Sequence, residues 1–243
     1  MNIFIHTRNH YQKARKPKLL KTLVADIGGT NSRLAIAITS KKDKDIILEN
    51  IQKFKNSDFN NFEEVIEKYL SSSNDDLISR MCIAAAGIIS EDTVEMSNLN
   101  WKITVPSLQK TSNIKSVLII NDLQAQGYAL DFIKPKDLEK LIEGNYSAAE
   151  IDTKLVCGMG TGFNVAIAYQ TAFGTFVPAS EYGHARTTTA NEKQKLIVKQ
   201  LEENSSFVSY ENILAGSGLN RLDKVLNRRE DRSPSDILEA AKA

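Results

Sequence analysis

Two glycine-rich turns are the part of this sequence best suited to bind a phosphate group. The first lies in residues 26–31, Asp-Ile-Gly-Gly-Thr-Asn, and the second in residues 158–162, Gly-Met-Gly-Thr-Gly. Each turn follows one short apolar run and precedes another, so each is predicted to join two strands. Glycine lets the backbone approach a ligand closely, and successive N–H groups in a turn form a concave anion site. A lone glycine-rich turn is equally typical of a tight hairpin, and that alternative stays open.

Two common nucleotide-binding motifs do not describe these turns. The sequence contains no G-x-x-x-x-G-K-[ST], which excludes a P-loop protein. The second turn is G-x-G-x-G, one residue shorter than the dinucleotide fingerprint, and it does not open a predicted helix. Because one turn lies in each half of the chain, we expect a phosphate to be held between two lobes.

Several polar side chains could bind a hydroxylated ligand. Asp122 directly follows an apolar strand, where a carboxylate can act as a general base or simply cap the next helix. Glu181 and His184 share one loop, in which they can bind neighbouring hydroxyl groups or face water, and Glu211 alone indicates only a surface residue. Together with Asn121, these side chains suit a polyhydroxylated ligand such as a sugar.

Hydrophobic periodicity predicts the elements that position these residues. The predicted strands are 22–28, 33–39, 46–54, 81–86, 116–120, 153–158, 163–170 and 173–179. The predicted helices are 60–70, 123–132, 191–203 and 209–243, the last with breaks at 216–218 and 233–234. Both halves share the order strand, glycine turn, strand, strand, helix, which indicates a mixed sheet flanked by helices in each lobe.

Composition narrows the class of protein. The 243 residues are 42% hydrophobic and 25% charged with a net charge of +1, which fits a globular protein and disfavours nucleic-acid or membrane partners. The longest apolar stretches are too short to span a bilayer. Cys82 and Cys157 both lie in predicted buried strands, so we expect neither a disulfide framework nor a zinc site and favour a cytoplasmic location.

Residues 1–21 differ from the rest of the chain, because they carry six Lys and Arg and no Asp or Glu. This charge pattern predicts a flexible basic arm, with a targeting or nucleic-acid role as the alternative.

The sequence resembles the bacterial ATP-dependent glucokinases of the actin, sugar-kinase and heat-shock ATPase superfamily. The resemblance extends from about Thr22 to Ala241 and rests on motifs that occur in the family's order. They are D-I-G-G-T-N-S-R at 26–33, C-I-A-A-A at 82–86, M-S-N-L-N-W at 96–101, I-N-D at 120–122, G-M-G-T-G at 158–162, E-Y-G-H at 181–184 and Y-E-N-I-L-A-G-S-G at 210–218. Many sugar kinases share D-x-G-G-T-N, but the complete ordered set is specific.

The resemblance implies an α/β, two-lobed, ribonuclease-H-like (actin-like ATPase) fold with mixed sheets flanked by helices and an incomplete second lobe. It leaves the flexible basic arm at 1–21 outside and implies an N-terminal lobe at 22–132 that carries the first phosphate loop and the catalytic Asp. An incomplete C-terminal lobe at 133–243 would carry the second phosphate loop and the sugar contacts. The exposed edge of that lobe's sheet and the habit of the family suggest a homodimer.

The implied activity is that of a glucokinase, which transfers the γ-phosphate of ATP to the 6-hydroxyl of D-glucose with Mg²⁺ as cofactor. Asp122 would be the general base. Glucose hydroxyls would be bound by Asn121, Asp122, Glu181, His184 and Glu211. ATP phosphates would be bound by Gly28, Gly29, Thr30, Asn31, Gly160, Thr161 and Gly162. Asp26 would hold Mg²⁺ through water.

The sequence also departs from the family. It stops before the segment with a third glycine-rich turn that holds adenosine, so the alternatives are a fragment of a full-length glucokinase or an inactive truncated paralogue that binds sugar or a partner. A superfamily member with another substrate is a third alternative. Asn164 stands where the family usually has glycine, Tyr182 replaces a small residue, Met159 lies inside a phosphate loop, and Ile88 stands where proline is frequent.

Overall fold

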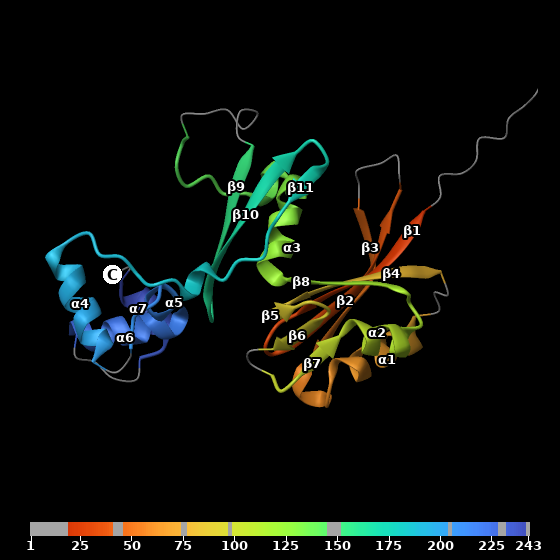
Figure 1. Cartoon of the computed structure of the whole chain (residues 1–243), viewed down its shortest axis with the longest axis horizontal. Helices are drawn as coiled ribbons and strands as arrows, with labels where there is room; N and C mark the ends of the chain where they lie inside the picture. Colours follow the sequence, from red (N-terminus) through yellow and green to blue (C-terminus); the bar gives the residue numbers. More distant parts are fainter. Residues whose placement is uncertain are drawn as a thin grey trace, which may run out of the picture. The chain divides into compact units, whose positions relative to one another are not determined.

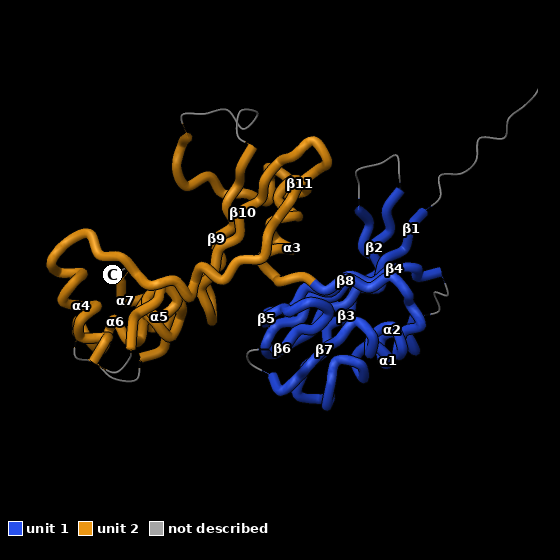
Figure 2. The backbone as a smooth tube through the Cα atoms, viewed as in Figure 1, with its two compact units in different colours: residues 1–119 blue, residues 120–243 orange. Residues whose placement is uncertain are grey.

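The chain folds into two compact units, residues 1–119 and 120–243 (Figure 2). The computed structural model describes residues 19–40, 46–73, 77–96, 99–144, 152–203, 206–227 and 232–241. Most of the predicted basic arm, residues 1–18, lies outside the described residues, whereas Leu20 and Lys21 already belong to the first strand. The lobe boundary predicted at residue 132 stays a prediction, and the division between the compact units falls earlier in the chain.

A five-stranded mixed sheet forms the centre of the first unit. Its strands are β1 (Leu20–Ile27), β2 (Asn31–Thr39), β3 (Ile46–Lys55), β4 (Ile78–Ala85) and β8 (Ser116–Asn121), in the order β3-β2-β1-β4-β8. β1 pairs antiparallel with β2 and parallel with β4 (Figure 1). All five correspond to predicted strands, and the chain passes into the second unit within β8.

Helix α1 (Phe62–Ser72) supplies the apolar stripe that packs against this sheet. Phe62, Val65, Ile66 and Tyr69 are fully buried, as their helical spacing predicts. Asn61 caps the helix by accepting a hydrogen bond from the Glu64 amide at 3.0 Å. A short 3-10 helix, η1 (Asn56–Asp58), connects β3 to this region.

A small second sheet and a second helix were not predicted. The sheet contains β5 (Gly87–Ser90), β6 (Thr93–Met96) and β7 (Lys102–Thr104), which are antiparallel, and α2 (Val105–Ser112) follows. Val94, Ile103 and Leu108 extend the core of the unit. Strands of three or four residues are too short to show periodicity, which explains the omission.

The second unit begins with helix α3 (Asp122–Ala129) and a three-stranded antiparallel sheet (Figure 1). The strands are β9 (Thr153–Met159), β10 (Phe163–Thr171) and β11 (Gly174–Phe176), in the order β11-β10-β9. Leu123 packs with Ala166, Ala168 and Val177 in a small core. The predicted helix 123–132 ends in the 3-10 helix η2 (Leu130–Phe132), followed by η3 (Pro135–Asp137), and the predicted strand 173–179 is only three residues long.

Short helices complete the second unit. They are η5 (Tyr182–His184), α4 (Glu192–Glu202), α5 (Glu211–Leu214), α6 (Gly216–Asn227) and α7 (Pro234–Ala240). The break predicted at 216–218 is wrong by a few residues, because α5 ends at Leu214 and residues 216–218 form the first turn of α6. The break predicted at 233–234 is confirmed at Ser233, the N-cap of α7. In the described part of the chain, no helix combines the length and the apolar character needed to cross a membrane.

The prediction that both cysteines lie in buried strands is wrong for Cys157. Cys82 is partly buried, and burial raises the pKa of its thiol. Cys157 is exposed, as are Leu155 and Met159 on the same face of β9. β9 is an edge strand, and only its other face, which carries Val156, packs against the core that contains Leu123.

Candidate active site

Asn121 and Asp122 lie where β8 ends and α3 begins. Asn121 is the N-cap: its Oδ1 accepts the Leu123 amide at 2.9 Å, and its own amide donates to Gln124 Oε1 at 3.1 Å. Because Asn121 fills the capping position, Asp122 becomes the first residue of the helix, where the helix dipole stabilises a carboxylate. Asp122 Oδ1 also accepts the Leu123 amide at 2.9 Å, and the side chain is half-buried.

Gln124 connects the start of α3 to the segment that leads into the predicted sugar loop. Its Nε2 donates a hydrogen bond to the Val177 carbonyl oxygen at 2.8 Å. Gly127, one turn later, has no space for a side chain, since a Cβ there would lie 2.8 Å from Val177 Cγ1. The approach of residue 177 to α3 therefore depends on two residues that sequence analysis did not select.

Glu181 is the N-cap of the 3-10 turn η5, and His184 is the last residue of that turn. The Glu181 Oε2 and His184 Nε2 atoms are 3.9 Å apart, and both side chains are more than half exposed. The pKa of Glu181 is raised, first by burial of its carboxyl group and then by the negative charges of Asp122 and Glu211, while His184 opposes the shift. Three predicted ligands, Asp122, His184 and Glu211, are therefore close enough to influence the pKa of Glu181.

Glu211 is attached to the second glycine turn. Its Oε2 accepts a hydrogen bond from the Phe163 amide at 3.1 Å, and a Cβ on Gly162 would lie 2.8 Å from that oxygen. The turn joins β9 to β10, as predicted, and is closed by a hydrogen bond from the Gly160 amide to the Gly162 carbonyl oxygen at 2.9 Å. The Gly216 amide donates to the Gly160 carbonyl oxygen at 2.8 Å, which fixes the turn to the start of α6.

The first glycine turn joins β1 to β2 in the first unit, again as predicted. Its Gly28 amide donates to the Asn31 carbonyl oxygen at 3.0 Å. The buried residue Asn56 braces it: Nδ2 donates to the Gly28 carbonyl oxygen at 2.8 Å, and the backbone amide donates to the Thr30 carbonyl oxygen at 2.9 Å. Sequence analysis missed Asn56, because a lone Asn after a strand gives no sign that it is buried.

Asp26, the predicted metal ligand, precedes this turn. Its Oδ2 lies 2.9 Å from Arg33 Nη1, and the carboxylate is half exposed. In the described ranges, no three His, Cys, Asp or Glu side chains are grouped as a metal site. Mg²⁺ usually takes one or two carboxylates and completes its shell with water and phosphate oxygens, so an accessible single carboxylate beside a phosphate turn fits this ion.

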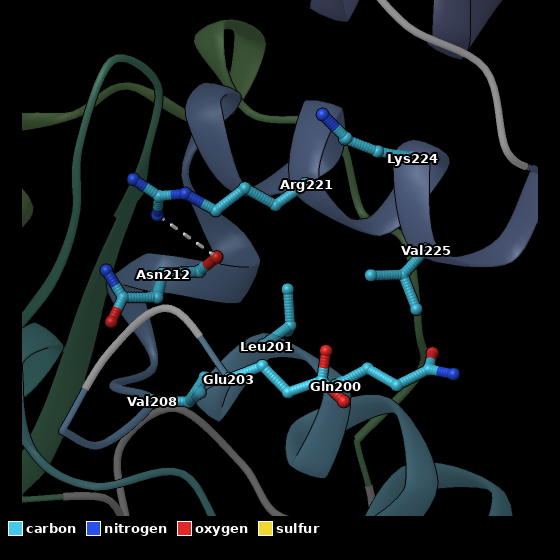
Figure 3. Close-up of a pocket in the computed structure, with 8 residues that line it drawn as sticks. All are labelled: Gln200, Leu201, Glu203, Val208, Asn212, Arg221, Lys224 and Val225. Carbon is cyan, nitrogen blue, oxygen red and sulfur yellow. Dashed lines mark hydrogen bonds between the residues drawn. The ribbon is translucent and has the colours of Figure 1, made fainter.

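A cavity of about 570 Å³ lies between α4 and α6 (Figure 3). It is lined by Gln200, Leu201, Glu203, Val208, Asn212, Arg221, Lys224 and Val225. None of the predicted site residues lines it. Within the second unit, the candidate site therefore consists of Asn121, Asp122, Glu181, His184, Glu211 and the second glycine turn, whereas Asp26 and the first turn belong to the first unit.

Comparisons with known proteins agree with these observations. The family model described as Glucokinase matches residues 23–243. The glucokinase of Erwinia tasmaniensis is 33% identical over 215 residues, which is 88% of this chain and 65% of the relative. That of Colwellia psychrerythraea is 34% identical over 206 residues, which is 84% of this chain and 60% of the relative. The chain thus spans less than two thirds of the length of these curated relatives.

Solved structures show the same fold. A glucokinase from an Antarctic psychrotroph superposes with a TM-score of 0.75 at 25% identity, over 92% of this chain and 71% of that one. A glucokinase from Balamuthia mandrillaris, crystallised with glucose, superposes with a TM-score of 0.67 at 22% identity, over 92% of this chain and 69% of that one. The expected actin-like ATPase fold, with mixed sheets and flanking helices, is confirmed.

Proposed function

Because this chain belongs to the glucokinase family, we propose that it transfers the γ-phosphate of ATP to the 6-hydroxyl of D-glucose. The observation that carries the proposal is geometric: Glu181 Oε2 lies 3.9 Å from His184 Nε2 on a loop that Asn164 binds to β10, the strand that follows the second glycine turn. Glu211 in turn binds the residue that follows the second glycine turn. Hydroxyl-binding groups and a phosphate-binding turn thus occur together.

Asp122 is the general base in this proposal. Its carboxylate takes the proton of the 6-hydroxyl while the sugar oxygen forms a bond to the γ-phosphorus and the bond to the leaving ADP breaks. The position of Asp122 at the first turn of α3, where its Oδ1 accepts the Leu123 amide at 2.9 Å, restrains the direction of the carboxylate. Asn121, Glu181, His184 and Glu211 bind the remaining hydroxyl groups and orient the sugar.

The two glycine turns bind the phosphates of ATP. Gly28, Gly29, Thr30 and Asn31 form one cradle, and Gly160, Thr161 and Gly162 form the other. Asp26 would hold Mg²⁺, and the ion, when bound, would neutralise charge on the phosphates. The bracing of the first turn by Asn56 supports a preformed cradle, since a fixed backbone needs no reorganisation when the anion binds.

The decisive experiment measures ATP-dependent formation of glucose 6-phosphate by the chain and by Asp122→Asn. We expect the variant to lose about 10²-fold or more in turnover, the range for a general base, while calorimetry shows nearly unchanged glucose binding. Equal turnover in both proteins would remove Asp122 from this role. Glucose binding without turnover in either protein would instead favour a sugar-binding paralogue, and a sugar other than glucose preferred in a panel would favour another kinase of the superfamily.

We further propose a cytoplasmic location and a homodimer. The first is supported by the two cysteines of the chain, Cys82 and Cys157, which are both free thiols and fit a reducing compartment. For the second, the three-stranded sheet ends at β9 and β11, and each of these strands pairs with only one described strand. Light scattering coupled to gel filtration tests the assembly, and a monomer mass at all concentrations would contradict it.

A further inference from the structure

The loop that carries Glu181 and His184 is attached to β10 by one side chain, that of Asn164. Asn164 Nδ2 donates to the Ser180 carbonyl oxygen at 2.6 Å and lies 3.4 Å from Glu181 Oε2. Asn164 Oδ1 accepts the Gly183 amide at 3.2 Å. The carboxamide therefore contacts the loop before, at and after Glu181.

The loop also packs tightly against β10 at Gly183. A Cβ on Gly183 would lie 1.8 Å from the Phe163 carbonyl oxygen, so the loop backbone packs directly on the backbone of β10. Phe163 also donates its amide to Glu211 Oε2 at 3.1 Å. Two consecutive residues of β10 thus bind both parts of the site: Phe163 binds Glu211, and Asn164 binds the Glu181–His184 loop.

The opposite side of the loop is attached to the start of α5 by an aromatic pair. Tyr182 and Tyr210 stack with ring centroids 5.4 Å apart and planes inclined by 19°. The Tyr210 hydroxyl lies 3.0 Å from the Thr188 hydroxyl, and the Tyr210 amide donates to the Ala185 carbonyl oxygen at 3.1 Å. Stacked aromatic pairs contribute beyond their buried area, so this contact restrains the loop next to Glu211.

We propose that Asn164 and Tyr182 are positioning residues, which together fix the Glu181–His184 loop in its ligand-binding geometry. The inference rests on the proposed function, in which Glu181 and His184 bind glucose hydroxyls. Both side chains are more than half exposed, so the loop needs restraint from its attachments rather than from burial. A loop that is already ordered loses less conformational freedom on binding, and the affinity for sugar rises accordingly.

The side chains of Asn164 and Tyr182 both act on this loop, the first through hydrogen bonds and the second through a ring contact. Asn164 binds the residues on both sides of Tyr182, so the two side chains restrain one segment. We therefore expect their effects on sugar affinity to be coupled, so that the loss in the double variant differs from the sum of the two single losses.

The test uses Asn164→Ala, Tyr182→Ala and the double variant. Tyr182→Phe keeps the ring and is the conservative control, and Tyr169→Ala and Asn220→Ala are matched controls at exposed positions outside the loop. Glucose affinity is measured by calorimetry. Hydrogen–deuterium exchange of residues 178–188 in the ligand-free protein, which needs no sugar, measures the order of the loop directly.

We expect each alanine variant to bind glucose about tenfold more weakly, the loss that corresponds to one net hydrogen bond or aromatic contact. Exchange in residues 178–188 should accelerate in both variants, while exchange in α4 and the behaviour of the three controls stay as in the wild type. Unchanged exchange in the alanine variants would overturn the proposal, whatever the affinity. If the wild type binds no glucose, the proposed function fails, and faster exchange in the variants would still support the positioning role.

Discussion

Asn56 Nδ2 donates a hydrogen bond to the carbonyl oxygen of Gly28 at 2.8 Å, although the two residues are 28 positions apart. Asn56 Oδ1 in turn accepts the hydroxyl of Ser32, and both side chains are buried. The carboxamide thus connects the two ends of the first glycine turn to the end of β3. The conformation of that turn depends on a residue outside it.

Replacing Asn56 by Ala should therefore destabilise the first unit and loosen the turn. The change leaves the Gly28 carbonyl oxygen and the buried Ser32 hydroxyl without this partner, which typically costs about 1–3 kcal/mol in the free energy of unfolding. Urea denaturation of the variant measures the loss, and Ser57→Ala, at the exposed neighbouring position, is the control. Equal stability of the two variants would show that the carboxamide does not brace the turn.

Much of the fold was predictable because local sequence and tertiary packing agree. In α1, the stripe of Phe62, Val65, Ile66 and Tyr69 is both helical in spacing and fully buried. The sheet of β5, β6 and β7 was not predictable, since its few buried positions, such as Val94 and Ile103, are too few to define a period. The prediction that Cys157 is buried was wrong for another reason. An apolar run indicates a strand, but it does not show whether both faces of that strand are covered.

The site was predictable only where its residues follow strands. Asp122 and the two glycine turns were found at strand ends, and the resemblance supplied roles for Glu181, His184 and Glu211. Asn56 and Asn164 were not assigned roles, because a polar side chain shows its partners only after strands far apart in the sequence have paired. The contact of Tyr182 with Tyr210 likewise depends on the pairing of the segments around Ala185 and Val208.

Glu181→Gln should weaken glucose binding without destabilising the free protein. Burial and the charges of Asp122 and Glu211 raise the pKa of Glu181. A raised carboxyl pKa means that the protonated form is favoured on folding, so the contribution of Glu181 to stability is most favourable at low pH and is lost as the pH rises through the raised value. Removing the charge relieves that cost, by less than about 1 kcal/mol because the side chain is half exposed.

Thermal unfolding and calorimetry at pH 4–8 test this prediction together. The stability of the wild type should fall progressively below that of Glu181→Gln as the pH rises from about 4.5 through the raised pKa, and the two should converge in acid. Glucose affinity of the wild type should decline over the same pH range as Glu181 becomes protonated. A variant that is less stable than the wild type at pH 7 would contradict the electrostatic interpretation.

Gly183→Ala should displace the sugar loop from β10. The added methyl group would lie 1.8 Å from the Phe163 carbonyl oxygen, and backbone atoms cannot move aside as a flexible side chain can. Such overpacking typically costs about 1–3 kcal/mol, and glucose binding should be lost with it. Gly144→Ala is the matched control, because no atom lies within 4 Å of a Cβ there. A fully stable Gly183→Ala protein that binds glucose normally would refute the close packing.

Asp131, in the 3-10 helix η2 that follows α3, should make the second unit sensitive to acid. Hydrogen bonds from Lys154, Thr175 and Gln170 lower its pKa from 3.8 to about 2. A depressed carboxyl pKa gives stability that is present above about pH 4 and is lost as the pH falls toward 2. The side chain is one-third exposed, so solvent screening limits the contribution to about 1 kcal/mol.

Asp131→Asn should therefore be less stable than the wild type at pH 7 and equally stable near pH 2, as followed by urea denaturation. The control Asp137→Asn should match the wild type throughout. A constant difference between Asp131→Asn and the wild type across this range would mean that the carboxylate charge contributes nothing.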